Sequence, residues 1–280
     1  MDRRTVLGLL AGTAAGLLPG AAAAHDHTQI DAHADAAWAE RFARLPGVRL
    51  QGDEQIAMLL YPGFTALDLV GPYHFLAGMM GAKVHLVSSG QDLAPVPSDL
   101  GLAIAPTVTY ADCPRTLTLV FVPGGTDGTL AAARDPRTPA FLRDTAVHAD
   151  YVTSVCTGAL ILGAAGLLRG RRATSHWSVR PLLTRFGATP VDARVVEDGK
   201  LITGAGVSAG LDFGLSVVAR LRGQPYAAAS MLTAEYDPQP PFPGGTLANT
   251  PAAVASAMTA MFASFVAAAG TLQPAPTPTQ

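Results

Sequence analysis

The sequence predicts an α/β fold in which helices cover both faces of a mostly parallel central sheet. From residue 55 onward, short apolar runs alternate with longer segments of helical character. The short runs are apolar throughout instead of alternating with polar residues, which is typical of strands buried on both faces. With 280 residues, 49% of them hydrophobic, the chain is long enough to bury a full core.

The first half of the domain supplies three strands, a small hairpin and two helices. A buried strand at 55–61 ends at Pro62-Gly63. We expect Gly71-Pro72 to interrupt the helix that follows at 65–80, because proline removes a helical hydrogen bond. The next expected elements are a strand at 83–89, a small hairpin of 93–97 and 102–108, a strand at 118–122 and a helix at 138–149.

The second half continues this alternation. A strand at 151–155 is followed by a buried helix of small and aliphatic residues at 158–168. An Asp-Gly pair, Asp198-Gly199, is typical of a tight hairpin turn. The remaining expected elements are a helix at 178–186, hairpin strands at 194–197 and 200–203, and helices at 207–222, 226–235 and 251–269.

The first 24 residues resemble an export signal. Arg3 and Arg4 precede an apolar run that ends at Leu18, and small residues follow up to Ala24. The run is too short to cross a bilayer comfortably and resembles a bacterial twin-arginine signal cleaved just before His25. We therefore expect an exported, periplasmic protein with no stable membrane association after cleavage. An uncleaved membrane anchor is the alternative.

The predicted domain, 55–270, has polar flanks. Residues 25–54 form a polar, alanine-rich connector that contains a short amphipathic helix at 35–44. Three histidines of this connector, His25, His27 and His33, fit a solvated leader better than a metal site. The proline-rich tail, 271–280, is expected to be disordered.

Charge and cysteine content exclude several classes of function. A net charge of −2 provides no basic surface for nucleic acid. Two cysteines do not make a disulfide framework, and the folded part has no Cys/His spacing typical of a metal site. We therefore expect a small-molecule substrate and no metal or cofactor.

Cys156 lies where the strand at 151–155 gives way to the helix at 158–168. A sharp strand-to-helix turn presents a nucleophile, and the free amides of a helix N-terminus favour negative charge. We expect this position to lower the pKa of the thiol toward neutrality and to make it reactive. An inert core cysteine is the alternative. Cys113, the other cysteine, is most simply a loop thiol.

Ligands of open α/β sheets bind beyond the carboxyl ends of the strands. If the strands are parallel, Asp68, the amides of Gly124 and Gly125, and Cys156 converge there, and Thr157 adds an amide and a hydroxyl. Glycine lets backbone N–H groups approach a developing anion. Asp68 is equally compatible with a plain helix N-terminal carboxylate, and the glycine pair with a plain turn.

Five motifs in order identify a resemblance. They are Tyr61-Pro-Gly-Phe-Thr-Ala-Leu-Asp-Leu-Val-Gly-Pro72, Val122-Pro-Gly-Gly125, Ser154-Val-Cys-Thr-Gly-Ala159, Arg172-Ala-Thr-Ser-His-Trp177 and Ile202-Thr-Gly-Ala-Gly-Val-Ser-Ala-Gly-Leu-Asp212. The set resembles the PfpI-type, class I glutamine amidotransferase-like superfamily and, within it, the isonitrile hydratases. The resemblance covers about residues 56–243. Five motifs in one order are far more specific than any one of them.

This resemblance implies a flavodoxin-like three-layer sandwich, a homodimer, and a cysteine on a strained nucleophile elbow. It implies that the Cys156 thiolate attacks an isonitrile carbon to give a thioimidate, that Asp68 moves the protons, and that water releases an N-substituted formamide. The amides of Gly125 and Thr157 would face the reacting atoms, and Val207 would help to wall the pocket.

Several positions bear on how far the resemblance extends. Thr157 stands where the superfamily's peptidases have histidine, which argues against proteolysis, and Asp68 is acidic where many members use a glutamate nearer the first strand. Ala205 replaces a glycine expected in the hydratases. His176 occupies the place of a catalytic histidine in some members, and we expect it among the substrate-binding residues. For catalysis, a structural histidine beside Trp177 is favoured because Asp68 already supplies an acid.

Two other functions remain open. One is a different enzyme activity on this scaffold, glyoxalase-like or amide-processing. The other is a non-catalytic, exported ligand-binding or redox-sensing domain in which Cys156 is oxidised. The same domain occurs in AraC-type regulators, but the C-terminal third shows no basic helix-turn-helix pair.

Overall fold

The computed structural model describes residues 36–275. The expected export signal at 1–24 and the three histidines His25, His27 and His33 lie outside the described residues. Of the predicted connector, the described part contains α1, Ala36–Ala43, where an amphipathic helix was expected.

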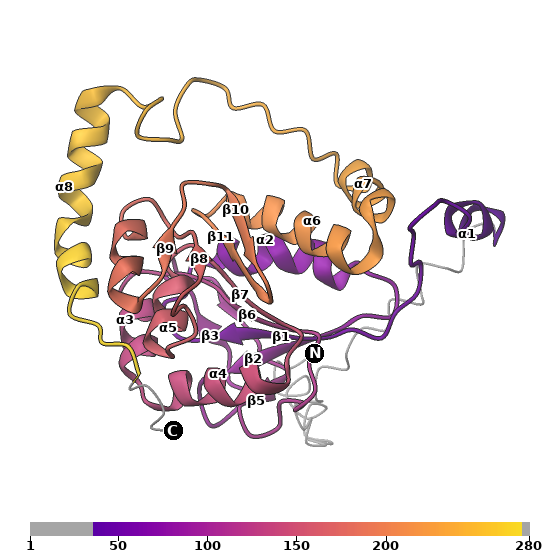
Figure 1. The fold of residues 1–280 in the computed structure, drawn as a ribbon, viewed down its shortest axis with the longest axis horizontal. Coiled ribbons are helices and arrows are strands. Elements are labelled where there is room, and N and C mark those ends of the chain that lie inside the picture. The colour runs from indigo at the N-terminus through magenta and orange to yellow at the C-terminus, as the bar shows by residue number, and fades with distance from the viewer. Residues whose placement is uncertain (1–35, 276–280) are drawn as a thin grey trace, which may run out of the picture.

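A seven-stranded sheet forms the centre of the molecule, in the order β10-β11-β7-β6-β1-β2-β5 (Figure 1). The strands are β1 Gln55–Leu60, β2 Lys83–Ser88, β5 Val108–Thr109, β6 Leu119–Val122, β7 Tyr151–Val155, β10 Val195–Asp198 and β11 Leu201–Gly204. Neighbours pair in parallel throughout, except in the antiparallel β10–β11 hairpin. The predicted mostly parallel sheet is therefore confirmed.

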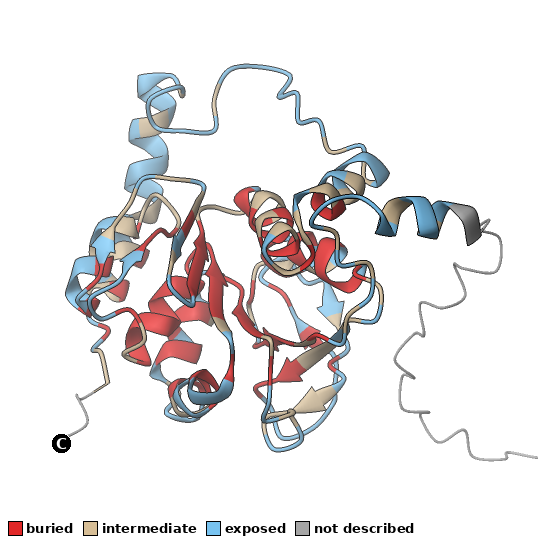
Figure 2. Ribbon diagram, turned by 45° about the vertical axis from the view of Figure 1, so that its right-hand side comes forward, coloured by how far each residue is buried: buried red, intermediate tan, exposed pale blue. Residues whose placement is uncertain are grey.

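Helices cover both faces of this sheet and make three layers (Figure 2). One face carries α2 Ala66–Ala77 and α6 Ala209–Arg222, and the other carries α3 Asp127–Arg134, α4 Arg137–His148 and α5 Gly158–Ala164. The outlying elements are α7 Gln224–Thr233, α8 Ala252–Ala269, a 3₁₀ helix at Arg180–Phe186, and the short strand pairs β3 Val96–Pro97 with β4 Ala103–Ile104 and β8 Arg172–Ala173 with β9 Thr189–Pro190.

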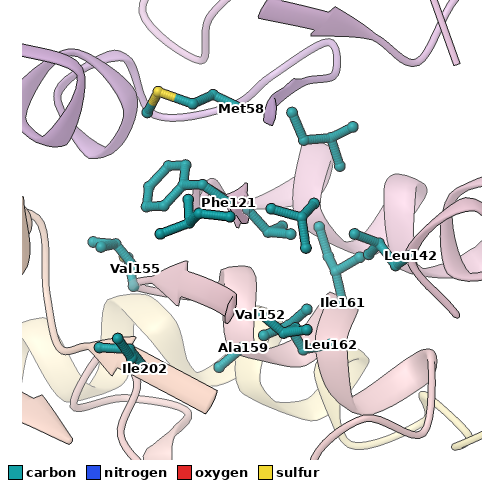
Figure 3. Close-up of a cluster of buried hydrophobic side chains, with 14 of the residues drawn as sticks. Met58, Phe121, Leu142, Val152, Val155, Ala159, Ile161, Leu162 and Ile202 are labelled. Atoms are coloured by element: carbon teal, nitrogen blue, oxygen red, sulfur yellow. The ribbon is translucent and has the colours of Figure 1, made fainter. Parts of the chain in front are cut away.

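The core lies between the central strands and the two helical layers. All four residues of β6 are buried, as are five of the six residues of β1. Phe121 of β6 packs toward α6, with its ring 5.5 Å from that of Phe213, and Val152 of β7 and Ile161 of α5 belong to the same buried cluster (Figure 3). Because both faces are covered, an alternating polar pattern would place polar groups in the core, which explains the uninterrupted apolar runs.

Helix α2 differs from the expected broken helix, because it runs continuously through Pro72. Gly71 and Pro72 are both buried in the contact with α6. A Cβ atom added to Gly210 of α6 would lie 3.2 Å from Pro72 Cδ, so the two helices approach closely. The burial gained from this packing offsets the hydrogen bond that proline removes.

Two other helices depart from the expectation. Helix α3 was not expected, because its sequence, Asp127 to Arg134, is short and rich in alanine and polar residues. The expected helix at 178–186 is a 3₁₀ helix at Arg180–Phe186, and Gly187, with φ of 74°, follows its last residue. Such a conformation is readily available only to glycine.

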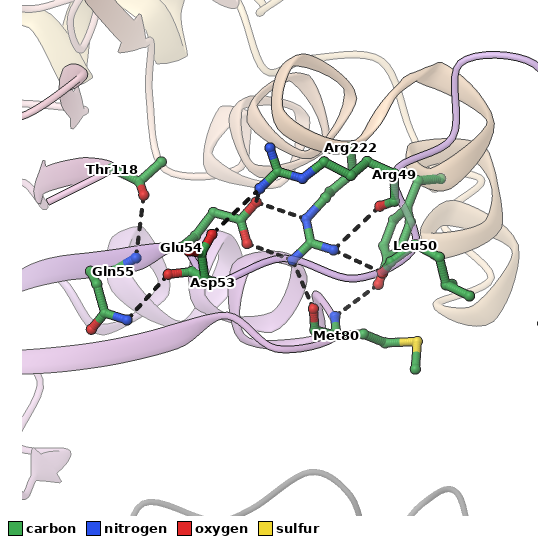
Figure 4. A network of polar contacts seen from close by, with 9 residues as sticks. Arg49, Leu50, Asp53, Glu54, Gln55, Met80, Thr118 and Arg222 are labelled. Atoms are coloured by element: carbon green, nitrogen blue, oxygen red, sulfur yellow. Dashed lines mark hydrogen bonds and ion pairs between the residues drawn. The ribbon is translucent and has the colours of Figure 1, made fainter. Parts of the chain in front are cut away.

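The folded domain begins before the predicted boundary at residue 55. Arg222, at the end of α6, is fully buried, and its guanidinium binds both carboxylate oxygens of Glu54, at 2.8 and 2.5 Å (Figure 4). It also donates to the carbonyl oxygens of Leu50 and Met80, each at 2.8 Å. Residues 49–54, assigned to the connector from sequence, are thus fixed against the core.

The C-terminal segment is also more ordered than expected. Phe265 and Ala269 of α8 and Leu272 beyond it are buried, and the Ala275 amide donates to the carbonyl oxygen of Ala164 at 2.9 Å. The predicted disorder of 271–280 is therefore wrong for 271–275, and residues 276–280 lie outside the described part. Apolar contacts of Leu272, which composition alone does not reveal, hold this segment in place.

Helix α8 itself is apolar on nearly every side. Its 18 residues have a mean hydropathy of 1.8 and only 11% of them are buried, so by length and composition alone it could cross a membrane. Its exposed part is the N-terminal half, whereas its last turns pack on the domain (Figure 2). A helix on the surface of a globular domain can show the same combination of an exposed apolar half and a packed half.

Candidate active site

Cys156 lies on a sharp turn between β7 and α5, as predicted. Its φ of 58° is in the left-handed region, which a non-glycine residue adopts only when its surroundings enforce it. The Cys156 amide donates to the carbonyl oxygen of Ala205 at 2.7 Å, and the Ser175 hydroxyl donates to the Cys156 carbonyl oxygen at 2.7 Å. A Cβ atom on Gly158 would lie 2.3 Å from the Val122 carbonyl oxygen, so α5 can begin this close to β6 only with glycine.

Asp68 reaches the same point from the first turn of α2 and is fully buried. The Gly124 amide donates to its Oδ2 atom at 3.0 Å. Among the described residues, no N–H or O–H donor reaches its other oxygen, Oδ1, which is also buried. The carboxyl is therefore directed across the site to Gly124 and is more than a helix N-terminal charge.

The environment of this pair sets its protonation. Burial raises the pKa of Asp68 to about 7, against hydrogen bonds from the Cys156 thiol and the Gly124 amide, which lower it. Burial also raises the pKa of Cys156 well above its usual range, and the charge of Asp68 raises it further, although the Thr157 amide acts in the opposite direction. The expected lowering of the thiol pKa is therefore wrong, because the loss of solvent around Sγ outweighs the helix N-terminus. At neutral pH the sulfur holds its proton, and Asp68 is the group available to accept it.

The Thr157 hydroxyl and the backbone of Gly125 are hydrogen-bonded to each other. The Thr157 hydroxyl donates to the Gly125 carbonyl oxygen at 2.6 Å and accepts from the Gly125 amide at 2.8 Å. The Thr129 hydroxyl lies 3.0 Å from the Thr157 hydroxyl and 3.0 Å from that of Tyr61. The Gly125 amide therefore does not face the reacting atoms as expected, whereas the Thr157 amide does point to the sulfur. The hydroxyl groups brace the loop instead.

Gly124 lies between the Asp68 carboxyl and the elbow at Cys156-Thr157. A Cβ atom at this position would lie 2.6 Å from Asp68 Oδ2 and 2.7 Å from the Thr157 nitrogen. No side chain fits there without separating the acid from the elbow. The sequence suggested the glycine pair, but only the structure shows which glycine contacts Asp68.

His176 lies at the rim of the site. It follows Ser175, and a Cβ atom on Gly206 would be 3.4 Å from His176 Cδ2. Burial and the charge of Arg180 lower the pKa of His176 to about 4, so the ring is neutral at neutral pH. Its Nδ1 atom lies 2.8 Å from the Ser178 hydroxyl. A neutral ring with this partner favours the structural interpretation over a proton-transfer role.

The other residues singled out from the sequence, Val207 and Cys113, have no hydrogen bond to Cys156 or Asp68 among the described residues. Val207 is half-buried just before α6, two residues after Ala205, whose carbonyl oxygen accepts a hydrogen bond from the Cys156 amide. Cys113 is half-buried, and burial raises the pKa of its thiol to about 11, so nothing activates it. Within residues 36–275 no group of three or more His, Cys, Asp and Glu side chains is placed to hold a metal ion.

Comparison with known proteins gives a family for this architecture. The model of the DJ-1/PfpI family matches residues 54–220, which include the elbow, Asp68 and the glycine pair. The chain belongs to the DJ-1/PfpI family. The fold is accordingly the α/β, flavodoxin-like sandwich of that family.

Three relatives are informative. The chain is 49% identical over 200 residues to the isonitrile hydratase of Pseudomonas putida, covering 71% of this chain and 86% of that protein. The solved structure of a THiJ/PfpI family protein from Pseudomonas syringae is 57% identical, with a TM-score of 0.79 over 81% of this chain and 93% of that chain. The glutathione-independent glyoxalase DJR-1.2 of Caenorhabditis elegans is more distant, at 27% identity over 50% of this chain and 75% of that protein.

Proposed function

We propose that this protein hydrates isonitriles to N-substituted formamides through a thioimidate on Cys156. The observation that carries the proposal is the buried carboxyl of Asp68 beside a protonated thiol, with one carboxylate oxygen fixed by Gly124 and the other reached by no N–H or O–H donor of the described residues. The 49% identity to an isonitrile hydratase supports it.

The first step needs a nucleophile and a proton at one carbon. As Cys156 Sγ bonds to the isonitrile carbon, the thiol proton passes to Asp68 and then to the same carbon, giving the thioimidate R–N=CH–S–Cys156. Asp68 is a carboxylate both before and after this step. Oδ1 is the oxygen free to carry the proton, because the Gly124 amide binds Oδ2 and no N–H or O–H donor of the described residues reaches Oδ1.

Water completes the cycle. Its oxygen bonds to the thioimidate carbon, and its two protons are placed on the nitrogen and, as the C–S bond breaks, on the sulfur. The products are the N-substituted formamide and the free thiol, so the net reaction adds one water to one isonitrile. Asp68 again relays the proton that passes between water and sulfur.

Features of the site also bear on the other functions. The neutral His176 and the absence of a histidine after Cys156 give no base–acid pair for amide hydrolysis. The raised pKa of Cys156 disfavours a redox sensor, because oxidants react with the thiolate. A glyoxalase-like activity has the support of the distant relative named above and is the second candidate.

The decisive experiment measures formamide formation from cyclohexyl isocyanide by wild type and Cys156→Ala. We expect turnover by the wild type, none by Cys156→Ala, and full turnover by Cys113→Ala, the matched control. Quenching the wild-type reaction with acid should show one substrate mass on the peptide that contains Cys156. An inactive wild type that consumes methylglyoxal, or an active Cys156→Ala, would refute the proposal in favour of another chemistry.

We also propose export and dimerisation. The twin arginine at residues 3 and 4 supports the periplasmic route. A protonated, 5% exposed thiol is suited to an oxidising compartment because it reacts slowly with oxidants. Fractionation of cells that express the wild type or Arg3→Lys, Arg4→Lys tests export: the wild type should appear cleaved in the periplasm and the variant should not. Light scattering tests the expected homodimer.

A further inference from the structure

The active site has one flank that is not fully buried. Asp68, Thr157 and Ser175 expose between 0 and 3% of their surface, and Cys156 exposes 5%. In contrast, His176 and Trp177, and across from them Gly206 and Val207, are half-exposed. The isonitrile group is linear, so the substituent on its nitrogen must extend directly away from the carbon that Cys156 attacks. Among these neighbours of the elbow, the half-exposed residues mark the side on which a substituent can extend from the buried pair.

Helix α8 places an aromatic ring on that flank. The Phe262 ring centroid lies 5.3 Å from that of His176 and 5.6 Å from that of Trp177, and the Trp177 contact is edge-to-face at 87°. His176 and Trp177 are themselves 5.3 Å apart. These distances are those of favourable aromatic contacts, so the three rings form one continuous apolar surface.

Helix α8 is attached to the domain through its C-terminal part. Below Phe262, Phe265 and Ala269 are buried, and the Arg134 guanidinium donates to Ala268 and Thr271 at 3.3 and 3.2 Å. Above Phe262, the helix is exposed and is joined to α7 by the long loop at 234–251, which lies on the surface (Figure 1, Figure 2). Phe262 therefore lies at the boundary between the anchored and the exposed part of α8.

We propose that Phe262 is a specificity-determining residue and that, with His176 and Trp177, it forms the surface that receives an apolar, preferably aromatic, substituent of the substrate. This inference rests on the proposed function only for the identity of the reacting group. Phe262 lies outside residues 54–220 that match the family, so it belongs to a segment whose role the family match does not define. The uncharged rings favour hydrocarbon groups over charged ones.

Binding without turnover provides the test. The chain has two tryptophans, Trp38 and Trp177, so a Cys156→Ala, Trp38→Phe protein reports on Trp177 alone. Titration with benzyl isocyanide should give a saturable change in its fluorescence. Phe262→Ala in this background should weaken binding about tenfold, as expected for the loss of one partly buried aromatic contact surface, and should change the binding of methyl isocyanide less than twofold.

Two further variants complete the design. Met258→Ala, one turn earlier on the exposed part of α8, should bind as the parent does. Phe262→Leu keeps an apolar contact for folding but removes the ring, and it should lose affinity for benzyl isocyanide in the same direction as Phe262→Ala. Equal effects of Phe262→Ala and Met258→Ala, equal effects on both ligands, or no binding of benzyl isocyanide would overturn the inference. Binding that depends on Phe262 in a protein whose wild type forms no formamide would instead refute the proposed function alone.

Discussion

Replacing Asp68 with asparagine should stabilise the protein above pH 7 while abolishing its activity. Asparagine is nearly isosteric and keeps an oxygen for the Gly124 amide, but it removes the buried charge. The pKa of Asp68 rises from 3.8 to about 7 on folding. Since each pH unit corresponds to about 1.4 kcal/mol, the folded wild type loses about 4 kcal/mol of stability from this group between pH 4 and pH 7.

The direction follows from proton binding. Between pH 4 and pH 7 the folded wild type retains a proton on Asp68 that the unfolded chain has released, so its free energy of unfolding falls as the pH rises. Above pH 7 both states are deprotonated and the loss is constant. Asparagine cannot ionise, so the variant lacks this loss throughout.

Urea unfolding followed by tryptophan fluorescence at pH 4.5, 6 and 8 measures this difference. We expect the stability gain of Asp68→Asn over wild type to grow by about 1.4 kcal/mol for each pH unit and to level off above pH 7. Asp144→Asn, a substitution at an exposed position of α4, controls for the general effect of removing an aspartate. A gain that does not depend on pH, or a loss at pH 8, would show that Asp68 is not held in an environment that penalises its charge.

The same variant should lose the proposed hydratase activity. Without a carboxyl group, the thiol proton has no relay to the isonitrile carbon, so the rate should fall by roughly 10² or more. A variant that is more stable at pH 8 and inactive would separate the catalytic role of Asp68 from any structural role. An Asp68→Asn protein with near-normal turnover would refute the proposed mechanism.

Three other predictions follow from the site and from the buried ion pair. The rate at low substrate concentration should rise with pH through about 7, where the cysteine–aspartate pair loses its first proton, and should then stay level to at least pH 9. A rate that falls above pH 7 would contradict ionisation of Asp68 before Cys156. Gly124→Ala should abolish turnover, because its Cβ atom would lie 2.6 Å from Asp68 Oδ2. Gly170→Asn, at an open turn whose φ of 70° asparagine tolerates, serves as its control in the formamide assay. Arg222→Ala should lower the free energy of unfolding by about 3–5 kcal/mol, measured in urea, because it leaves the buried carboxylate of Glu54 with fewer partners; a loss below 1 kcal/mol would show that the ion pair contributes little.

Much of the fold could be predicted from the sequence. The apolar runs identified the central strands, since a strand covered on both faces has to be apolar at every position. Features that depend on partners distant in sequence could not be predicted. Pro72 does not break α2 because of its packing on α6, and Leu272 is ordered because it is buried beside the core.

The candidate site divides in the same way. The order of the motifs placed Cys156, Asp68 and Gly124 at the carboxyl ends of three neighbouring strands, and the structure brings these residues together. The role of Ser175 in holding the elbow and the place of Phe262 on the rim had no signal in the sequence. Ser175 is distant in sequence from Cys156, and Phe262 is distant in sequence from His176.

The sequence by itself determined which residues could react, because strand ends and glycine pairs follow from local patterns. Only the tertiary structure decided their protonation. The pKa values of the thiol and the carboxyl depend on how much water the surrounding layers exclude, and burial raised both, whereas the local helix N-terminus had predicted a lowered thiol pKa. Solvent exclusion is a property of the whole packed molecule, so no local stretch of the chain encodes it.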